Sequence, residues 1–169
     1  LLKDDILSQN PHLCVVKSIS KSYGVPGFRL GVLASGNREL IAKLKREVAI
    51  WNINSFGEFY MQIYEKYHKD YLKACELFRE ERKLFYDELQ QIPYLHVIPS
   101  QANYFLCEIT EGSLSARELA VRLLSDHDIL IKDCSQKAAF RGRNYIRLAV
   151  RDRKDNHRLV EALKLYIQR

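Results

Sequence analysis

The stretch "SISKSYGVPGFRLG", from Ser18 to Gly31, brings a lysine, two serines and an arginine close together in the chain. The amine of Lys21 can form a Schiff base with an aldehyde, because a lysine beside a buried strand tends to have a lowered pKa. The hydroxyls of Ser18 and Ser20 and the planar guanidinium of Arg29 suit a phosphate dianion. Together these residue types indicate a ligand with an aldehyde at one end and a phosphate at the other.

Pyridoxal 5′-phosphate is a common cofactor that carries both groups. Gly24 and Gly27 permit a close approach of the backbone, and Pro26 stiffens the turn between the lysine and the arginine. The residues alone leave a second interpretation open, in which this glycine-rich loop carries only solvated charge.

Two short apolar runs flank the loop and predict two buried strands, over about residues 12–19 and 28–35. Asn37 is predicted to cap a helix that ends near Trp51. A longer helical pattern runs from about residue 56 to residue 91, and Pro93 ends it. An aromatic stripe, more typical of a core than of a partner surface, follows this helix and includes Phe59, Tyr60, Tyr67, Tyr71 and Phe78.

The rest of the chain predicts a small α+β domain. Its strands are expected over residues 94–100, 103–109, 129–134 and 144–150, and its helices over 115–128 and 153–169. We therefore divide the chain into 1–50, 51–92 and 93–169, with the middle segment as a connecting helix. Two strands and one helix cannot cover both faces of a sheet, so residues 1–50 are expected to be stable only against something that the chain lacks.

The opening stretch resembles the S-x-[SA]-K-x-x-[GA]-x-x-G-x-R-x-G signature of fold-type I pyridoxal-phosphate enzymes of the class I/II aminotransferase superfamily. The similarity is greatest to the histidinol-phosphate aminotransferase and threonine-phosphate decarboxylase branch. It implies that Lys21 forms the Schiff base with the cofactor and that Ser18, Ser20 and Arg29 hold the cofactor phosphate. The implied fold class is α/β, a partial PLP-dependent transferase fold in which 1–50 ends the large cofactor-binding domain and 93–169 is the small C-terminal domain.

The resemblance continues in "WNINSFGE", "PSQANYFLCEI" and "ILIKDCS…NYIRLAVR". It implies that Arg147 binds the α-carboxylate of the substrate and that Asn103 lies near the active site. Burial favours the functional interpretation of Arg147 over an ion pair at a strand edge, because Arg147 lies close to the apolar centre of "YIRLAV". For Asn103, a turn amide is nearly as good an interpretation.

The resemblance also implies an Asp that holds the pyridine nitrogen and a nearby Tyr, both upstream of the lysine, and Asp4 and Asp5 are poor substitutes for that Asp. We therefore expect the isolated chain to be inactive and the parent protein to transfer an amino group between an amino acid, or an amino-alcohol phosphate, and a 2-oxo acid. A decarboxylase of the threonine-phosphate type is the alternative, because the orientation of the substrate selects the Cα bond that breaks. A dimerisation or binding module without catalytic activity is a third hypothesis.

The composition excludes several other classes. The formal net charge is +6, but basic and acidic residues alternate along the predicted helices, which disfavours nucleic acid as a partner. The sequence shows no apolar run long enough to cross a membrane and no secretory signal, so we expect a cytoplasmic protein. Part of the aromatic stripe should lack the large domain that normally flanks it, so we expect a homodimer. The four cysteines lack the spacing of a zinc site, so no metal is expected.

Overall fold

The computed structural model describes residues 3–110, 114–140 and 142–166. The chain divides into two compact units, Leu1–Lys73 (unit 1) and Ala74–Arg169 (unit 2). Within the described residues, no helix is both long and apolar enough to cross a membrane.

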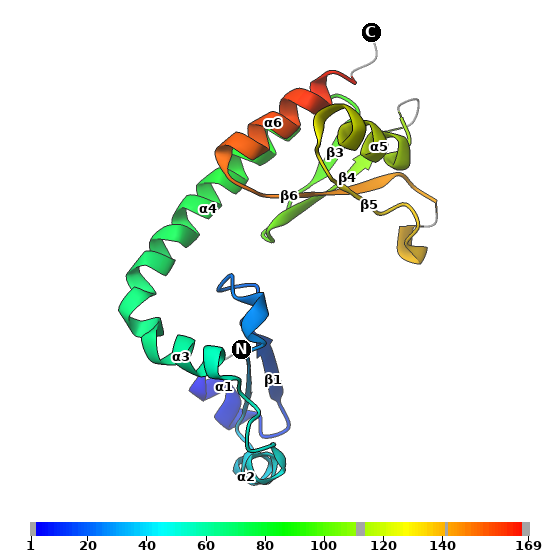
Figure 1. The fold of residues 1–169 in the computed structure, drawn as a ribbon. Helices are drawn as coiled ribbons and strands as arrows, with labels where there is room; N and C mark the ends of the chain where they lie inside the picture. Colours follow the sequence, from blue (N-terminus) through cyan, green and yellow to red (C-terminus); the bar gives the residue numbers. More distant parts are fainter. Residues whose placement is uncertain (1–2, 111–113, 141, 167–169) are drawn as a thin grey trace. The chain divides into compact units, whose positions relative to one another are not determined.

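Unit 1 is built around a two-stranded antiparallel sheet with helices before and after it (Figure 1). Its elements are α1 (Asp4–Gln9), β1 (Cys14–Ser18), the 3-10 helix η1 (Pro26–Phe28), β2 (Gly31–Ser35), α2 (Arg38–Glu47), α3 (Ser55–Ile63), the 3-10 helix η2 (Tyr64–Tyr67) and the first residues of α4 (His68–Leu89). Both strands were predicted, but neither carries a buried residue. The expectation that this segment cannot cover its own sheet is confirmed, because among the described residues of unit 1 only Ser20, Leu30 and Gly57 are buried.

Three helices of unit 1 differ from the sequence prediction. The Asn37 side chain accepts the Leu40 N–H at 2.9 Å and caps α2 as expected, but α2 ends at Glu47, where Val48 turns to an extended backbone. The single helix expected over residues 56–91 is three segments, because η2 separates α3 from α4. Helix α1 was not predicted; it is only six residues long, which is too short for a hydrophobic period.

Unit 2 contains the hydrophobic core. Its elements after α4 are β3 (Leu95–Ile98), β4 (Tyr104–Ile109), α5 (Ala116–His127), β5 (Lys132–Asp133), the 3-10 helix η3 (Ala138–Phe140), β6 (Tyr145–Ala149) and α6 (Arg153–Lys164). The strands form one antiparallel sheet in the order β3-β4-β6-β5. All four predicted strands and both predicted helices are present, although the strand expected over 129–134 is reduced to Lys132–Asp133. The part of the last helix expected over 167–169 lies outside the described residues.

One face of this sheet packs against helices (Figure 1), and the other face carries exposed residues that include Tyr104 and Arg147. The alternation along β6 shows the two faces: Ile146 and Leu148 are fully buried, whereas Arg147 and Ala149 are exposed. The helix residues in the core include Phe85 and Leu89 of α4, Leu119 and Leu123 of α5, and Leu159, Val160 and Leu163 of α6. The open face is therefore the one that can meet a ligand.

Candidate active site

Lys21 lies in a tight turn that begins where β1 ends. Within the turn, the Val25 N–H donates to the Ser20 carbonyl at 2.9 Å and the Tyr23 N–H donates to the Ile19 carbonyl at 3.1 Å. Gly24 has φ +67°, a left-handed conformation that costs a glycine little. These bonds fix the backbone on both sides of Lys21, while its side chain remains exposed.

The two serines occupy different environments. Ser18 is the last residue of β1 and pairs with Gly31 of β2, whereas Ser20 has already left the strand and is only 6% exposed. The argument that places Ser18 and Ser20 on one face by strand alternation therefore fails beyond Ser18. The Ser20 hydroxyl makes no hydrogen bond to another described residue, so it is a donor next to the lysine that a ligand could use.

Arg29 follows η1 and has φ +55°, one of two non-glycine residues with a left-handed backbone in the described part of the chain. This conformation costs an L-residue about 1 kcal/mol or more, and such strain gathers at functional sites. The Arg29 guanidinium donates at 3.4 Å to the carbonyl of Pro26, three residues earlier, and is exposed. It forms no ion pair with any described residue.

Helix residues hold this turn from one side. The ring of Tyr23 stacks on Tyr71 with centroids 4.7 Å apart and meets the edge of Tyr64 at 5.2 Å. The Tyr71 hydroxyl donates to the Ser22 carbonyl at 3.0 Å, directly after Lys21. The sequence placed Tyr71 on an aromatic stripe but gave no role to Tyr23 or Tyr64. The spacing of four between Tyr60, Tyr64 and His68 was the available signal.

A second set of contacts fixes the arginine end of the loop. The Asn54 side chain donates to the Phe28 carbonyl at 2.8 Å and accepts the Gly57 N–H at 2.9 Å, so one amide both tethers the loop and caps α3. The Phe28 ring lies 5.3 Å from that of Tyr60. These contacts orient the backbone that carries Arg29.

Arg147, the residue expected to bind a carboxylate, lies on β6 in unit 2. This strand is in the interior of the sheet, and the Arg147 side chain is exposed on the open face, with its guanidinium 5.2 Å from the Tyr104 ring. The burial argument for a functional role of Arg147 therefore fails, because the side chain is exposed. The alternative, an ion pair at a strand edge, fails as well, because none of the ion pairs among the described residues includes Arg147. Asn103 is exposed, and its carbonyl accepts the Val150 N–H at 3.0 Å.

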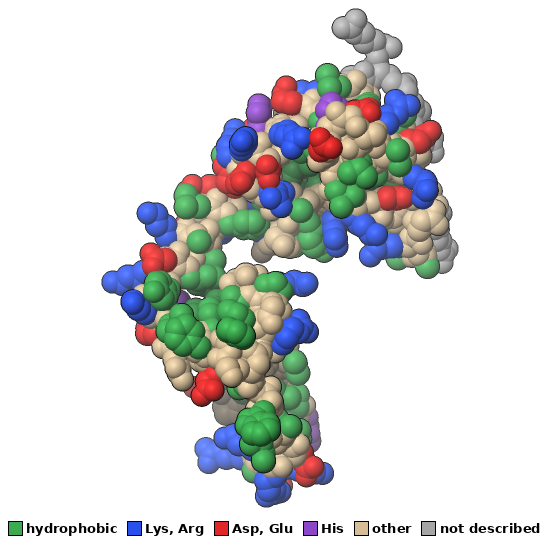
Figure 2. Space-filling view, in the orientation of Figure 1, with side chains coloured by type: hydrophobic (Ala, Val, Ile, Leu, Met, Phe, Trp, Pro, Cys, Tyr) green, Lys and Arg blue, Asp and Glu red, His purple; other side chains and the backbone are tan. Residues whose placement is uncertain are grey.

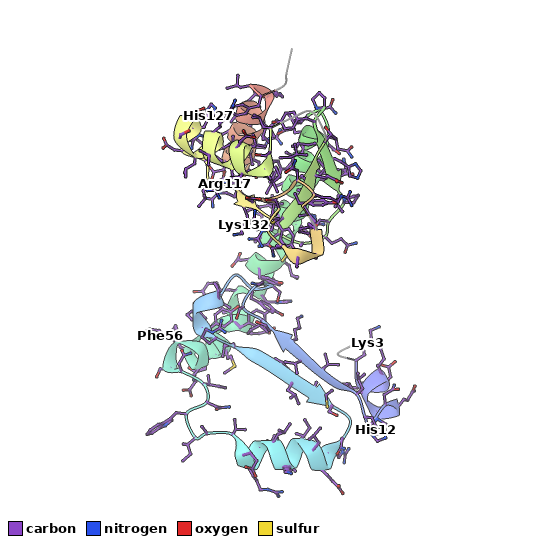
Figure 3. The ribbon with its side chains drawn as sticks, turned by 90° about the vertical axis from the view of Figure 1, so that its right-hand side faces the viewer. Lys3, His12, Phe56, Arg117, His127 and Lys132 are labelled. Carbon is purple, nitrogen blue, oxygen red and sulfur yellow. The ribbon has the colours of Figure 1, made fainter. Side chains whose placement is uncertain are left out.

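Lys132 on β5 is a candidate that the sequence reasoning missed. It is the register partner of Arg147, so two cationic side chains stand side by side on the open face. Figure 3 labels Lys132 on its strand. Like Arg147, it has no acidic partner among the described residues. The run "ILIKDC" held the only signal, a lysine within an apolar strand.

The carboxylate of Glu108, on the same face, is neutralised by its partners. Arg143 donates to both oxygens of Glu108, at 2.8 and 2.7 Å, and the Tyr145 hydroxyl donates to the same carboxylate at 3.1 Å. These hydrogen bonds, first of all that of Arg143, lower the pKa of Glu108 below its ordinary value. Among the described strand residues of this face, Lys132 and Arg147 are therefore the cations without an acidic partner.

The candidate residues thus form two groups. Lys21, Ser20 and Arg29 lie in the loop between β1 and β2 of unit 1, with Ser18 at the end of β1. Arg147, Lys132 and Tyr104 share one face of the unit 2 sheet, and Asn103 lies just before β4.

Comparison with known proteins gives consistent matches. The family model "Aminotransferase class I and II" matches residues 5–163. The chain is 33% identical over 160 residues to the threonine-phosphate decarboxylase of Salmonella typhimurium, covering 94% of the chain and 42% of that protein. A decarboxylase structure from Sulfurospirillum multivorans matches with a TM-score of 0.84 and 30% identity, over 99% of the chain and 42% of that structure.

A histidinol-phosphate aminotransferase structure from Clostridium acetobutylicum matches with a TM-score of 0.81 and 29% identity, over 96% of the chain and 48% of that structure. The chain therefore spans less than half the length of these three proteins. Its α/β fold is the corresponding part of the fold that they share.

Proposed function

This chain belongs to the family of class I and II aminotransferases, and from this membership we propose that its parent protein is a pyridoxal-phosphate enzyme that decarboxylates a phosphorylated amino acid. The pair of adjacent cations, Lys132 and Arg147, carries the proposal about the substrate. Two like charges directly opposite each other destabilise a sheet, and an anion bound to both removes that cost. A substrate with a carboxylate and a phosphate supplies such anions. The name of the threonine-phosphate decarboxylase relative refers to a substrate of this kind.

The loop of unit 1 fits the cofactor by the chemistry of its donors. The Ser18 and Ser20 hydroxyls and the Arg29 guanidinium are donors suited to a phosphate, and Lys21 has an exposed amine. We assign Ser18, Ser20 and Arg29 to the cofactor phosphate and Lys21 to its aldehyde. Pyridoxal phosphate, when bound, supplies that aldehyde and an electron sink for a bond at the substrate Cα.

The residues of this chain then bind, orient and transfer protons. Arg147 holds the α-carboxylate, and Lys132, its register partner, holds a second anionic group. Asn103, whose carbonyl bonds to Val150, is assigned a place near the active site. Holding the substrate at both ends decides which Cα bond is aligned for cleavage. If the bond to the carboxylate is aligned, carbon dioxide leaves and Lys21 delivers a proton to Cα. If the C–H bond is aligned, the Lys21 amine removes that proton.

Transamination between an amino acid and a 2-oxo acid is the second candidate. The similarity to the histidinol-phosphate aminotransferase structure supports it. The residues of this chain would have the same roles, and only the Cα bond that is aligned for cleavage would differ. The Asp and Tyr that the family resemblance implies upstream of the lysine are not in this sequence. We therefore propose that residues 1–169 alone have no activity.

We further propose that the parent protein is a homodimer. Large hydrophobic side chains of unit 1 are exposed, including Ile50 (93%), Trp51 (91%), Phe56 (74%) and Phe59 (59%). Figure 2 shows hydrophobic groups on the visible face of this unit. Phe56 lies on α3 at the outer side of the unit (Figure 3). Exposed apolar patches of this kind mark surfaces that a partner covers. A stable, dilute monomer of the full-length protein in light scattering would count against the homodimer.

The test of the cofactor assignment uses the full-length protein. It is mixed with pyridoxal phosphate, reduced with borohydride and digested, and the labelled peptide is identified by mass spectrometry. We expect the label on Lys21, with a Lys21→Ala variant unlabelled and a Lys17→Ala variant labelled as the wild type is. An unlabelled Lys21 would contradict both candidate functions.

The reaction is then measured with O-phospho-L-threonine and O-phospho-L-serine. Release of carbon dioxide together with the matching amino-alcohol phosphate supports decarboxylation. Formation of a 2-oxo acid from the substrate, with no carbon dioxide, supports transamination instead. Without either product, the proposed substrate class is wrong.

A further inference from the structure

The backbone next to Lys21 is held by aromatic residues that lie far along the sequence. Tyr71 bonds through its hydroxyl to the Ser22 carbonyl at 3.0 Å and stacks its ring on Tyr23 at 4.7 Å, with an angle of 25° between the two planes. Tyr64 packs its ring against the other two, with centroids 5.2 Å from Tyr23 and 6.4 Å from Tyr71. The residues immediately after Lys21 are therefore fixed from α4 and η2.

A hydrogen-bonded chain locks the same cluster. The Tyr64 hydroxyl lies 2.8 Å from Nδ1 of His68, one turn along the helical segment. A side-chain hydrogen bond with Tyr23 raises the pKa of Tyr64 to about 12, so the Tyr64 phenol keeps its proton at neutral pH. His68 in turn lies 6.3 Å from the Tyr71 ring. Each ring of the cluster is thus held by at least two of the others.

We propose that Tyr71, Tyr23 and Tyr64 are positioning residues that set where the Lys21 amine can reach. The inference rests on the proposed function, since it concerns the lysine assigned to the cofactor. None of the three is assigned to contact the cofactor or the substrate. They act through the backbone of the turn.

The physical reason lies in the turn itself. It contains Gly24, it is mostly exposed, and the strand before it has no buried residue. Such a segment samples several conformations unless contacts outside it select one. A lysine amine at the end of four methylenes moves with its Cα, and proton transfer falls steeply when the donor is displaced by about 1 Å. The hydroxyl of Tyr71, bonded directly after Lys21, is the most local of these contacts.

The test removes that one hydroxyl in the full-length protein. Tyr71→Phe keeps the stacked ring and loses the bond to the Ser22 carbonyl. Tyr67→Phe is the matched control, because Tyr67 is 49% exposed and its one side-chain contact among the described residues is a cation–π contact with Lys66. Circular dichroism and thermal melting establish that both variants are folded.

Two readouts follow the turn and the lysine separately. In the cofactor-free protein, amide exchange of Tyr23, Gly24 and Val25 should become about five- to tenfold faster in Tyr71→Phe, as expected for the loss of one hydrogen bond. In the cofactor-loaded protein without substrate, the midpoint of the pH titration of the cofactor's visible absorbance should move by about half a unit or more. Tyr67→Phe should change neither.

The outcomes separate this inference from the proposed function. A wild-type protein that takes up pyridoxal phosphate with no label on Lys21 would contradict the proposed function. A wild type labelled on Lys21, with a Tyr71→Phe variant whose exchange and titration match it, would overturn the positioning role alone. A variant with a lower melting temperature but an unchanged titration would show a purely structural role and would also overturn it.

Discussion

Lys132 of β5 and Arg147 of β6 stand directly opposite each other in an antiparallel register, both exposed on the open face of the unit 2 sheet. Neither has an acidic partner among the described residues, although Glu108 and Arg143 form a bidentate pair on the same face. The sheet therefore keeps an unfavourable pair of like charges beside a neutralised one. An anion bound to Lys132 and Arg147 would offset this repulsion. Anion binding at this pair can be tested by removing one charge at a time.

Replacing Lys132 by Gln in the full-length protein should weaken binding of a phosphorylated substrate. A charge-assisted hydrogen bond contributes about 1.5–3 kcal/mol, so KM for O-phospho-L-threonine should rise roughly ten- to hundredfold. KM for an unphosphorylated amino acid should change little, because Arg147 still holds the carboxylate. Lys137→Gln, which removes another exposed lysine of unit 2, is the control. An equal rise of KM for both substrates would contradict the assignment of Lys132 to the second anion.

The chemistry of the lysine loop could be predicted from the sequence because the residue types themselves carry it. Lys21 and Arg29 lie in one short stretch, and the loop places them in one unit whatever the surrounding helices do. The pairing of Lys132 with Arg147 could not be predicted in this way. It depends on the register between β5 and β6, and a slip of one residue would turn one of the two side chains to the core face.

The contacts among Tyr23, Tyr64 and Tyr71 could not be predicted from the sequence either, for a different reason. A regular helix over residues 56–91 puts Tyr60, Tyr67 and Tyr71 on one stripe but gives no contact to Tyr23. The 3-10 turn η2 changes the phase of the helix at Tyr64, and contacts with a turn far back in the sequence arise only in the folded unit. The prediction that β1 and β2 are buried strands was wrong, because neither strand has a buried residue in this chain. Burial, like these contacts, depends on what packs against a strand in the folded unit.

The ion pair of Glu108 predicts how the stability of unit 2 depends on pH. Hydrogen bonds from Arg143 and Tyr145 lower the pKa of Glu108 from its ordinary value near 4.5. A carboxylate with a lowered pKa in the folded state contributes stability that is complete above its ordinary pKa and is lost as pH falls through the lowered one. The melting temperature of the wild type should therefore fall as the pH drops below the ordinary pKa of a glutamate and through the lowered pKa of Glu108.

Glu108→Gln should flatten this part of the profile and lower the melting temperature at pH 7. Glu76→Gln serves as the control, because Glu76 makes only an exposed contact of 4.0 Å with Arg79 and should leave the profile unchanged. A Glu108→Gln profile as steep as that of the wild type would show that other carboxylates cause the acid sensitivity.

The cysteines should differ sharply in reactivity. Burial raises the pKa of the Cys107 thiol to about 12, whereas Cys14 on β1 is exposed. At pH 8 only about one Cys107 in ten thousand is a thiolate, which is the reactive form. An aromatic disulfide reagent should therefore modify Cys14 in the native isolated chain, and Cys107 only at the rate at which unit 2 unfolds. Cys107→Ala should leave the fast phase intact, and Cys14→Ala should reduce it to the part contributed by the half-exposed Cys75. Fast modification of Cys107 in the native chain would contradict the closed core.

The last prediction separates the two hydrogen bonds of Asn54. Its side-chain oxygen accepts the Gly57 N–H at 2.9 Å at the start of α3, and its nitrogen donates to the Phe28 carbonyl at 2.8 Å in the loop that leads to Arg29. Asn54→Asp keeps the acceptor and removes the donor, so α3 should stay capped while the loop loosens. Asn54→Ala removes both, and the lost cap should cost about 1 kcal/mol.

Amide exchange in the full-length protein can distinguish these effects. Exchange of the Gly57 amide should be fast in Asn54→Ala and close to that of the wild type in Asn54→Asp. Both variants should retain less pyridoxal phosphate after dialysis, because the Arg29 guanidinium is no longer held over one position for the cofactor phosphate. If Asn54→Asp retained the cofactor as firmly as the wild type, the tether to Phe28 would have no part in placing Arg29, and the cap of α3 would be the whole role of Asn54.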